Sequence, residues 1–313
     1  MRFEGVIPPV ITPMKPDRSI DRDGFVGVVE HLCASGVHGV IVGGTTGEYY
    51  AQTAEERVDL MRLGRQAVKG VALIVGVGAT RTEDSVAFAE AARAAGTDGI
   101  LIGAPPYALP TPEELADHVR AVDRAARLPI MLYNYPGRTG TLMSRPFFDL
   151  VARDTHVRAI KESSGSIEQL HMLANDYPGI DLFCGMDDQA LEFYAWGAKG
   201  WVCGAGNCLP AEHLALHRAC AIENDVAKGR RIMAALLPLM HVLEQGGKFV
   251  QCIKHGCALA GLPAGPVRRP LAELDERRKA ELAETIATLK QAIAEIDRGA
   301  MAPGGGRQRA VHG

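Results

Sequence analysis

The sequence predicts a (β/α)8 barrel, the TIM barrel of the α/β class, followed by a C-terminal helical extension. Two observations lead to this prediction. Short apolar segments alternate with longer amphipathic segments along the chain, and eight such pairs can be counted. The chain has 313 residues and is 47% hydrophobic, which is enough for the core of one domain of this size.

The apolar segments are the expected strands of the barrel. Each is apolar almost throughout instead of alternating with polar residues, as is typical of parallel strands that are buried on both faces. Eight units of strand and helix indicate a closed barrel, not an open doubly wound sheet. The expected strands are residues 5–11, 39–43, 72–76, 99–103, 129–134, 157–161, 181–184 and 200–204.

Helix start signals lie between these segments. Thr53 and Glu56 have the spacing of a capping box, in which each side chain binds the other residue's backbone N–H. Residues 111–114 combine such a box with a proline at the first helical position. Thr82, followed by two acidic residues, marks a third start. Each signal places a helix after a strand, as the barrel requires.

We expect three parts of the chain. Residues 1–224 form the barrel, and residues 225–298 show helical patterns only, which predicts an extension packed against the barrel. Residues 299–313 include a proline followed by three glycines and little that could be buried. We predict that this last part is a disordered tail.

The composition argues against several classes of protein. A net charge of −3 without a basic face disfavours binding to nucleic acid. No segment reaches the ~18 apolar residues of a membrane span, and the first residues do not resemble a signal peptide. Seven scattered cysteines, an odd number, indicate reduced thiols. We therefore expect a soluble, cytoplasmic protein that binds neither nucleic acid nor a membrane.

The signals for a metal or a nucleotide cofactor are weak. Cys252, His255 and Cys257 match no common zinc spacing, and His213 and His217 lack the glutamate of an H-E-x-x-H site. The glycines at 76–79 follow the third strand and lack the third glycine of a dinucleotide fingerprint. We expect no metal and no organic cofactor.

Residues that bear chemistry in such a barrel belong at the carboxyl ends of the strands. The loop after the second strand carries Thr45, Thr46 and Gly47 in a glycine-rich context. Its N–H and hydroxyl groups can bind a carboxylate, and an ordinary tight turn explains the same residues equally well.

Two tyrosines and an arginine follow the next strands. Tyr107 comes after the fourth strand, and Tyr133 ends the fifth. Each tyrosine can act as a proton shuttle or be a packed aromatic residue. Arg138, between glycines, can bind an acidic substrate or be an ordinary surface arginine.

Lys161 lies at the end of the sixth apolar segment. By alternation it shares a face with Ala159. If that face is the barrel interior, a charged lysine there is costly unless it is paired or its pKa falls. A neutral amine is what attack on a carbonyl requires. The strand alone leaves two interpretations open, a Schiff-base lysine and a structural salt-bridge lysine.

Taken together, these segments resemble the dihydrodipicolinate synthase / N-acetylneuraminate lyase family. The resemblance extends over residues 5–274 and rests on four runs in matching order and spacing, at 44–48, 133–136, 137–140 and 160–162. It implies an imine between Lys161 and the keto group of a 2-oxo acid, with the lysine as electron sink and no metal or organic cofactor.

The resemblance also implies roles for the other residues. The loop with Thr45, Thr46 and Gly47 would hold the substrate carboxylate. Tyr133 would relay protons with Thr45 and Tyr107, and Tyr107 would be able to reach the site of a neighbouring subunit. The partners implied are a small 2-oxo acid and further copies of the chain, in a homotetramer built as a dimer of dimers. The pocket would be completed by Arg138, Cys203 and Gly204.

Local runs divide between branches of the family. The threonine loop and Arg138 favour 4-hydroxy-tetrahydrodipicolinate synthase, but its Asn-Pro-x-Pro-x-Lys segment, here 249–254, lacks both prolines. The sequence elsewhere is similar to L-2-keto-3-deoxyarabonate dehydratase, at residues 47–53, 105–110, 187–192 and 247–256.

The leading prediction is therefore dehydration of L-2-keto-3-deoxyarabonate to 2-oxoglutarate semialdehyde. The alternatives are the synthase or another pyruvate aldolase of the family, and a non-catalytic protein that binds 2-oxo acids. A metal-dependent hydrolase on the same barrel is disfavoured, because no paired histidines end the first strand.

Overall fold

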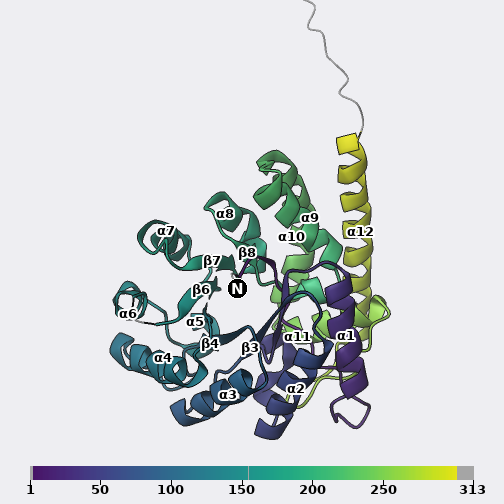
Figure 1. Cartoon of the computed structure of the whole chain (residues 1–313). Helices are drawn as coiled ribbons and strands as arrows, with labels where there is room; N and C mark the ends of the chain where they lie inside the picture. Colours follow the sequence, from purple (N-terminus) through teal and green to yellow (C-terminus); the bar gives the residue numbers. More distant parts are fainter. Residues whose placement is uncertain (1–2, 154, 302–313) are drawn as a thin grey trace, which may run out of the picture.

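The computed structural model describes residues 3–153 and 155–301. In this part of the chain eight parallel strands form a ring that helices surround (Figure 1), which confirms the predicted (β/α)8 barrel. The strands are β1 (Gly5–Val6), β2 (Gly39–Val42), β3 (Ala72–Gly76), β4 (Gly99–Gly103), β5 (Ile130–Asn134), β6 (Val157–Glu162), β7 (Asp181–Cys184) and β8 (Gly200–Trp201).

The ring closes between its first two strands. From β2 to β8 each strand pairs in parallel with the next, and β8 pairs with β1. A bridge between Pro9 and Ile41 joins the segment after β1 to β2, and the Val10 N–H donates to the Ile41 carbonyl at 2.8 Å. No strand edge of the barrel is therefore left open in the described chain.

The first and last strands are shorter than predicted. The ladder of β1 stops at Val6 instead of residue 11, because Pro8 and Pro9 follow and proline has no N–H to donate. The ladder of β8 stops at Trp201 instead of residue 204, just before the 3-10 helix η4 (Ala205–Asn207).

The helices begin where the sequence signals predict. Glu56 N–H donates to Thr53 Oγ1 at 3.2 Å and the reciprocal bond is 3.0 Å, so this capping box is present, as is the one at residues 111–114. The third start is also correct, although Arg81 is the N-cap there and makes no side-chain cap bond. The barrel helices are α1 (Arg22–Ala34), α2 (Ala54–Ala67), α3 (Thr82–Ala94), α4 (Pro112–Ala126), α5 (Pro136–Thr139), α6 (Arg145–Val151), α7 (Ile167–Asp176), α8 (Ala190–Ala195) and α9 (Pro210–His217).

The barrel interior is apolar at its centre and hollow at its carboxyl end. One inward side chain from each strand or its continuation fills the centre: Ile7, Ile41, Ile74, Leu101, Met131, Ala159, Phe183 and Val202. Two residues further along, on the same face, lie Pro9, Gly43, Gly76, Gly103, Tyr133, Lys161, Gly185 and Gly204, all of which line cavities. Five of these eight are glycines, so the space that a further core layer would fill stays open for a ligand.

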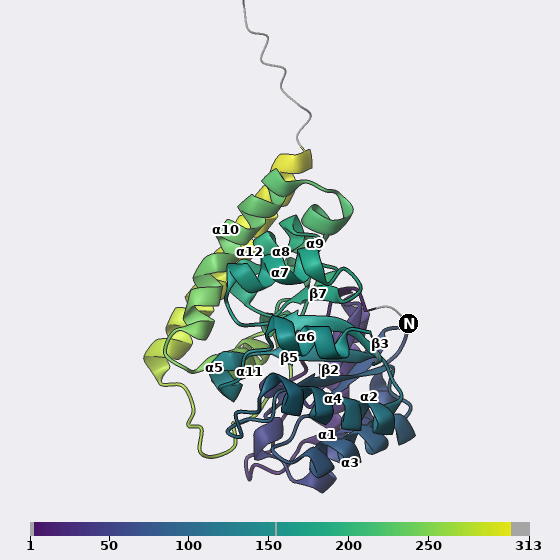
Figure 2. The same cartoon turned by 90° about the vertical axis from the view of Figure 1, so that its left-hand side faces the viewer.

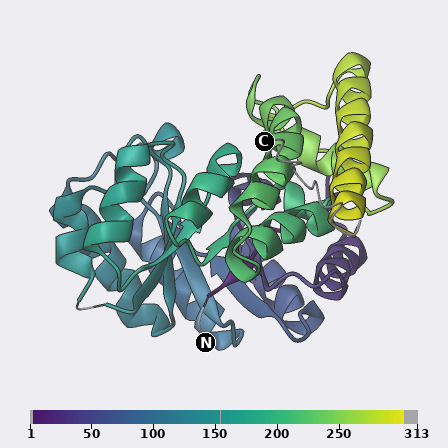
Figure 3. The same ribbon diagram turned by 90° about the horizontal axis from the view of Figure 1, so that it is seen from above.

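The C-terminal segment is helical and packs on the barrel. It comprises α10 (Val226–Glu244), α11 (Phe249–Leu259) and α12 (Glu276–Met301). Helices α10 and α12 lie side by side along one flank (Figure 2), and seen from above α12 forms the outer edge of the molecule (Figure 3). Helix α12 runs past the expected boundary at 298, so residues 299–301 are helical and not part of a tail. The rest of the predicted tail lies outside the described residues.

Candidate active site

Lys161 lines a cavity at the carboxyl end of the barrel. Its strand turns Ala159 and Lys161 to the interior, as alternation predicted. The residue is only 8% exposed, and its Nζ lies 4.2 Å from the centroid of the Tyr133 ring. A second cavity adjoins the first, and both are lined by Thr45, Tyr133, Tyr135 and Arg138.

The surroundings of Lys161 favour its neutral form. Burial lowers the pKa of Lys161, because the ammonium loses its solvation, and the nearby Asp187 carboxylate opposes this decrease. Among the described residues no carboxylate oxygen lies within 4.0 Å of Nζ; the buried lysine that does form an ion pair is Lys254. A structural salt bridge therefore does not account for Lys161.

Tyr133 stands beside Lys161, as its register partner on the neighbouring strand. Burial raises the pKa of Tyr133, while a hydrogen bond with the Thr45 side chain and the charge of Arg138 oppose the rise. The phenol is therefore protonated near neutral pH and can donate a proton. Once it has done so, the phenolate is a strong base.

The two threonines lie in a short turn after β2. They belong to the 3-10 helix η1 (Thr45–Gly47), which Gly43 precedes with a φ of +73°, a conformation that favours glycine. Thr45 and Thr46 both line the cavity of Lys161. Because the first N–H groups of a helical turn have no acceptor within it, the turn can present both N–H and hydroxyl donors to a carboxylate.

Gly47 lies behind this turn and lines neither cavity. Its N–H donates to Gly44 O at 3.1 Å, and its carbonyl accepts from Thr12 Oγ1 and Gln52 Nε2, each at 2.7 Å. A Cβ at this position would lie 2.8 Å from Val10 O. Both backbone groups of Gly47 are therefore bonded within the chain, and its role in substrate binding stays a prediction.

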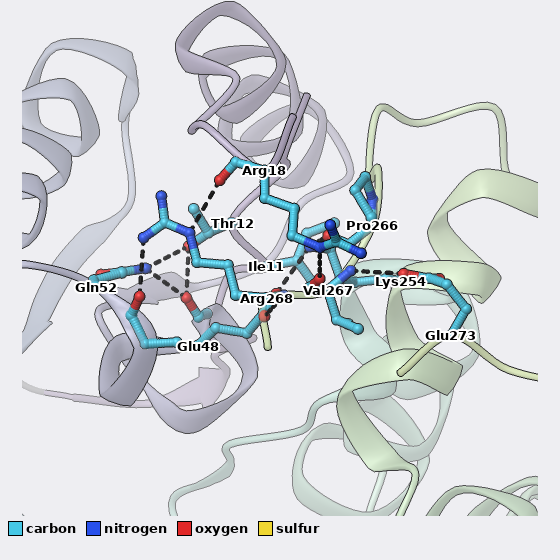
Figure 4. A network of polar contacts seen from close by, with 12 residues as sticks. Ile11, Thr12, Arg18, Glu48, Gln52, Lys254, Pro266, Val267, Arg268 and Glu273 are labelled. Atoms are coloured by element: carbon cyan, nitrogen blue, oxygen red, sulfur yellow. Dashed lines mark hydrogen bonds and ion pairs between the residues drawn. The ribbon is translucent and has the colours of Figure 1, made fainter. Parts of the chain in front are cut away.

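A buried ion pair fastens the end of the same loop to the C-terminal extension. Glu48, in the left-handed conformation with φ +59°, accepts from Lys254 Nζ and from the Arg268 N–H, each at 2.8 Å (Figure 4). Lys254 also donates to Pro266 O at 2.6 Å, and the Lys254 and Glu48 side chains are 3% and 0% exposed. The Arg268 guanidinium binds Glu56 through two hydrogen bonds of 2.5 and 2.6 Å. These contacts hold the loop that carries the two threonines.

Arg138 lies at the mouth of the site, in α5. It lines both cavities, and its guanidinium carbon is 5.4 Å from the centroid of the Tyr135 ring. Arg138 forms no ion pair with any residue that the structure describes, so its charge is available to an anionic group.

Two acidic residues in the wall of the cavity were not predicted. Asp187, after β7, is buried and accepts from Trp201 Nε1 at 2.8 Å, and burial raises its pKa to about 7. Glu244 ends α10 and lines the same cavity, and burial raises its pKa as well. The position of Asp187 at a strand end was a usable signal. Glu244 was not foreseeable, because nothing local relates the extension to the barrel mouth.

In the segment after β8, one of the two expected residues lines the cavity. Gly204 lines it together with Val202, whereas Cys203 lies in the core between the barrel and its helices. Cys203 follows the end of the β8 ladder, and its expected place in the wall of the site stays a prediction. A Cβ at Gly204 would lie 2.4 Å from Phe249 Cζ, so the glycine leaves the space in which this side chain of the C-terminal extension packs beside the cavity.

Tyr107 lies away from the cavities of its own chain. It is 94% exposed, has a φ of +73° and lines neither cavity. Among the described residues no hydrogen bond or ring contact joins Tyr107 to Tyr133, and the expected role of Tyr107 in the relay stays a prediction.

The histidines and cysteines that could bind a metal form no metal site among the described residues. His213 Nδ1 lies 2.7 Å from Leu209 O, and His217 Nδ1 lies 3.0 Å from the Tyr194 hydroxyl. Over residues 3–153 and 155–301 no cluster of three or more metal-binding side chains exists, and all seven cysteines are free thiols. In the same ranges, no helix is both long enough and apolar enough for a membrane span.

The chain is similar over nearly its whole length to one family of enzymes. Residues 2–289 match the model of the dihydrodipicolinate synthetase family. The 4-hydroxy-tetrahydrodipicolinate synthase of Salinibacter ruber is 38% identical over 280 residues, which cover 88% of this chain and 92% of that protein. The solved 4-hydroxy-tetrahydrodipicolinate synthase of Methylacidiphilum fumariolicum SolV is 29% identical with a TM-score of 0.88, covering 95% of this chain and 99% of that one.

A second solved structure carries a ligand. It is a prophage protein of the dihydrodipicolinic acid synthase family from E. coli K12 in complex with pyruvate. It is 30% identical with a TM-score of 0.87, and the match covers 92% of this chain and 99% of that chain.

Proposed function

The chain belongs to the dihydrodipicolinate synthetase family and is a lyase of that family, and we propose that it acts through a Schiff base between Lys161 and a 2-oxo acid. The observation that carries this proposal is a buried lysine without an ion-pair partner among the described residues, on the inward face at the carboxyl end of the barrel. Pyruvate, the ligand of one solved relative, is the simplest acid of this class. The iminium itself accepts the electrons, so the proposed reaction uses no metal or organic cofactor.

The first half of the reaction uses Lys161, Tyr133 and the threonine turn. The neutral amine attacks C2 of the substrate and forms a carbinolamine, while the turn with Thr45 and Thr46 holds the C1 carboxylate. Tyr133 donates its proton to the C2 hydroxyl, which leaves as water, and the C2–N iminium forms. The phenolate then removes a proton from C3, and the C–H electron pair gives the enamine.

We further propose that the second half is a dehydration, with L-2-keto-3-deoxyarabonate as substrate. The enamine expels the C4 hydroxyl, which leaves as water with a proton from Asp187, whose pKa of about 7 keeps part of it protonated near neutral pH. Transfer of a proton from C5 to C3 produces an enol that becomes the C5 aldehyde. Water hydrolyses the imine and releases 2-oxoglutarate semialdehyde. The local sequence similarities and the acidic residues in the cavity wall support this choice.

Borohydride trapping with a panel of 2-oxo acids tests the first half. Mass spectrometry should find a reduced adduct on Lys161, and Lys161→Met should remove it while the far-UV circular dichroism stays that of the folded protein. An adduct on another residue, or no adduct with any acid, would contradict the Schiff base on Lys161. Incubation with L-2-keto-3-deoxyarabonate tests the second half, and an adduct without semialdehyde would rule out the dehydration alone.

The second candidate is 4-hydroxy-tetrahydrodipicolinate synthase. The names of the relatives favour it, and so does the guanidinium of Arg138, which forms no ion pair with a described residue and suits a second carboxylate. This enzyme would consume pyruvate together with aspartate semialdehyde. A non-catalytic protein would bind 2-oxo acids and turn over neither substrate.

We also propose a cytoplasmic homotetramer, in which the exposed Tyr107 completes the site of a neighbouring chain. Tyr107 and Leu109, two residues apart, are 94% and 62% exposed, and a group of exposed apolar side chains supports an interface at this position. Analytical ultracentrifugation would show the tetramer, and Tyr107→Phe should slow imine formation if the hydroxyl takes part in the relay.

A further inference from the structure

Glu244 occupies a position that local structure disfavours. It is the last residue of α10, where the negative end of the helix dipole opposes a carboxylate. Its side chain is half-buried and, among the described residues, makes no ion pair and no hydrogen bond. An acidic residue that breaks a local rule without a partner among the described residues indicates a role toward a ligand.

The cavity that Glu244 lines carries charged residues at both the expected 2-oxo acid end and the distal end of a substrate. Lys161 and the threonine turn lie where the 2-oxo acid end of a substrate would bind, and Arg138 lies at the mouth. Arg138 by itself would attract any second carboxylate at the far end of the substrate. Glu244 lines the same cavity as Arg138, and the two charges are close enough that Arg138 opposes the rise in the pKa of Glu244.

We propose that Glu244 is a specificity-determining residue, which admits substrates with an uncharged distal chain and rejects those with a second carboxylate. A carboxylate at this place accepts hydrogen bonds from the hydroxyl groups of a sugar acid. It repels the distal carboxylate of a dicarboxylic acid and offsets the attraction of Arg138. The inference rests on the proposed function, because it places the 2-oxo acid end of the ligand at Lys161.

The test compares two acids with the same carbon chain. 2-Oxopentanoate ends in a methyl group, and 2-oxoglutarate ends in a carboxylate. Isothermal titration calorimetry on the full chain gives the ratio of their dissociation constants. The wild type should bind 2-oxopentanoate about tenfold more tightly than 2-oxoglutarate. Glu244→Gln, which keeps the shape and removes the charge, should reduce this ratio about tenfold.

A matched control has the same change in net charge outside the cavity. Glu284→Gln, on the exposed side of α12, should leave the ratio at its wild-type value. Both ligands are measured on one preparation, so a smaller folded fraction cancels in the ratio. Equal affinities in the wild type, or a ratio that Glu244→Gln changes less than twofold, would overturn the inference.

Borohydride trapping of the same two acids separates this inference from the proposed function. Absence of a Lys161 adduct would overturn the Schiff base, whereas the ratio from calorimetry still decides the role of Glu244.

Discussion

Removal of the Lys254 charge tests how much the buried ion pair with Glu48, which joins the threonine loop to the C-terminal extension, stabilises the protein. In Lys254→Met the Glu48 carboxylate, 0% exposed, would lose its buried cationic partner at 2.8 Å and keep the Arg268 N–H at 2.8 Å. Breaking a buried ion pair by removing one partner costs about 3–5 kcal/mol, because the remaining charge stays desolvated. Since one strong donor remains on Glu48, we expect a loss near the lower end, about 3 kcal/mol of unfolding free energy.

Equilibrium unfolding in urea, at one protein concentration, measures this loss. The control is Lys228→Met, which breaks a pair with Glu223 at 2.9 Å whose side chains are 16% and 38% exposed, and should cost about 0–1 kcal/mol. Adding Glu48→Gln to Lys254→Met removes the stranded charge and should restore about 1 kcal/mol or more. A loss in Lys254→Met no larger than in the control, or no recovery in the double variant, would show that the buried pair does not stabilise the fold in this way.

Two further predictions concern the surroundings of the reactive amine. Gly185→Ala would place a Cβ 2.1 Å from Ser163 Oγ and 2.6 Å from Lys161 Cγ, so the rate of borohydride trapping with pyruvate should fall about tenfold or more. The control is Gly179→Ala, whose new Cβ meets no atom within 4 Å and which should be trapped at the wild-type rate. Equal trapping rates in the two variants would contradict this prediction. The trapping rate should fall at low pH as the amine becomes protonated. Because the Asp187 carboxylate raises the pKa of Lys161, Asp187→Asn should move this decrease to lower pH, and a move to higher pH would show that the sign is wrong.

Local patterns predicted the secondary structure well because their causes are local. A capping box needs only a threonine and a glutamate three residues apart, and both boxes formed as expected. The apolar segments marked all eight strands, since a parallel strand buried on both faces is apolar whatever its neighbours are. The errors lie at strand ends, where Pro8 and Pro9 interrupt a ladder that composition alone would extend.

Alternation along one strand was enough to place Lys161 on the inward face with Ala159. After β8, where the ladder has ended, Val202 lines the cavity and Cys203 packs in the core between the barrel and its helices. The direction of a side chain is set by alternation only within a strand, so local patterns did not fix it in this segment.

The barrel, the inward lysine and the turn with two threonines follow from local sequence patterns, because each depends on residues close together in the chain. The residues that enclose the lysine depend on long-range packing. Glu48 and Lys254 are 206 residues apart, and Glu244 reaches the cavity from a helix beyond the barrel. Such contacts depend on how the extension packs against the barrel, which is set by the whole core and not by any local pattern.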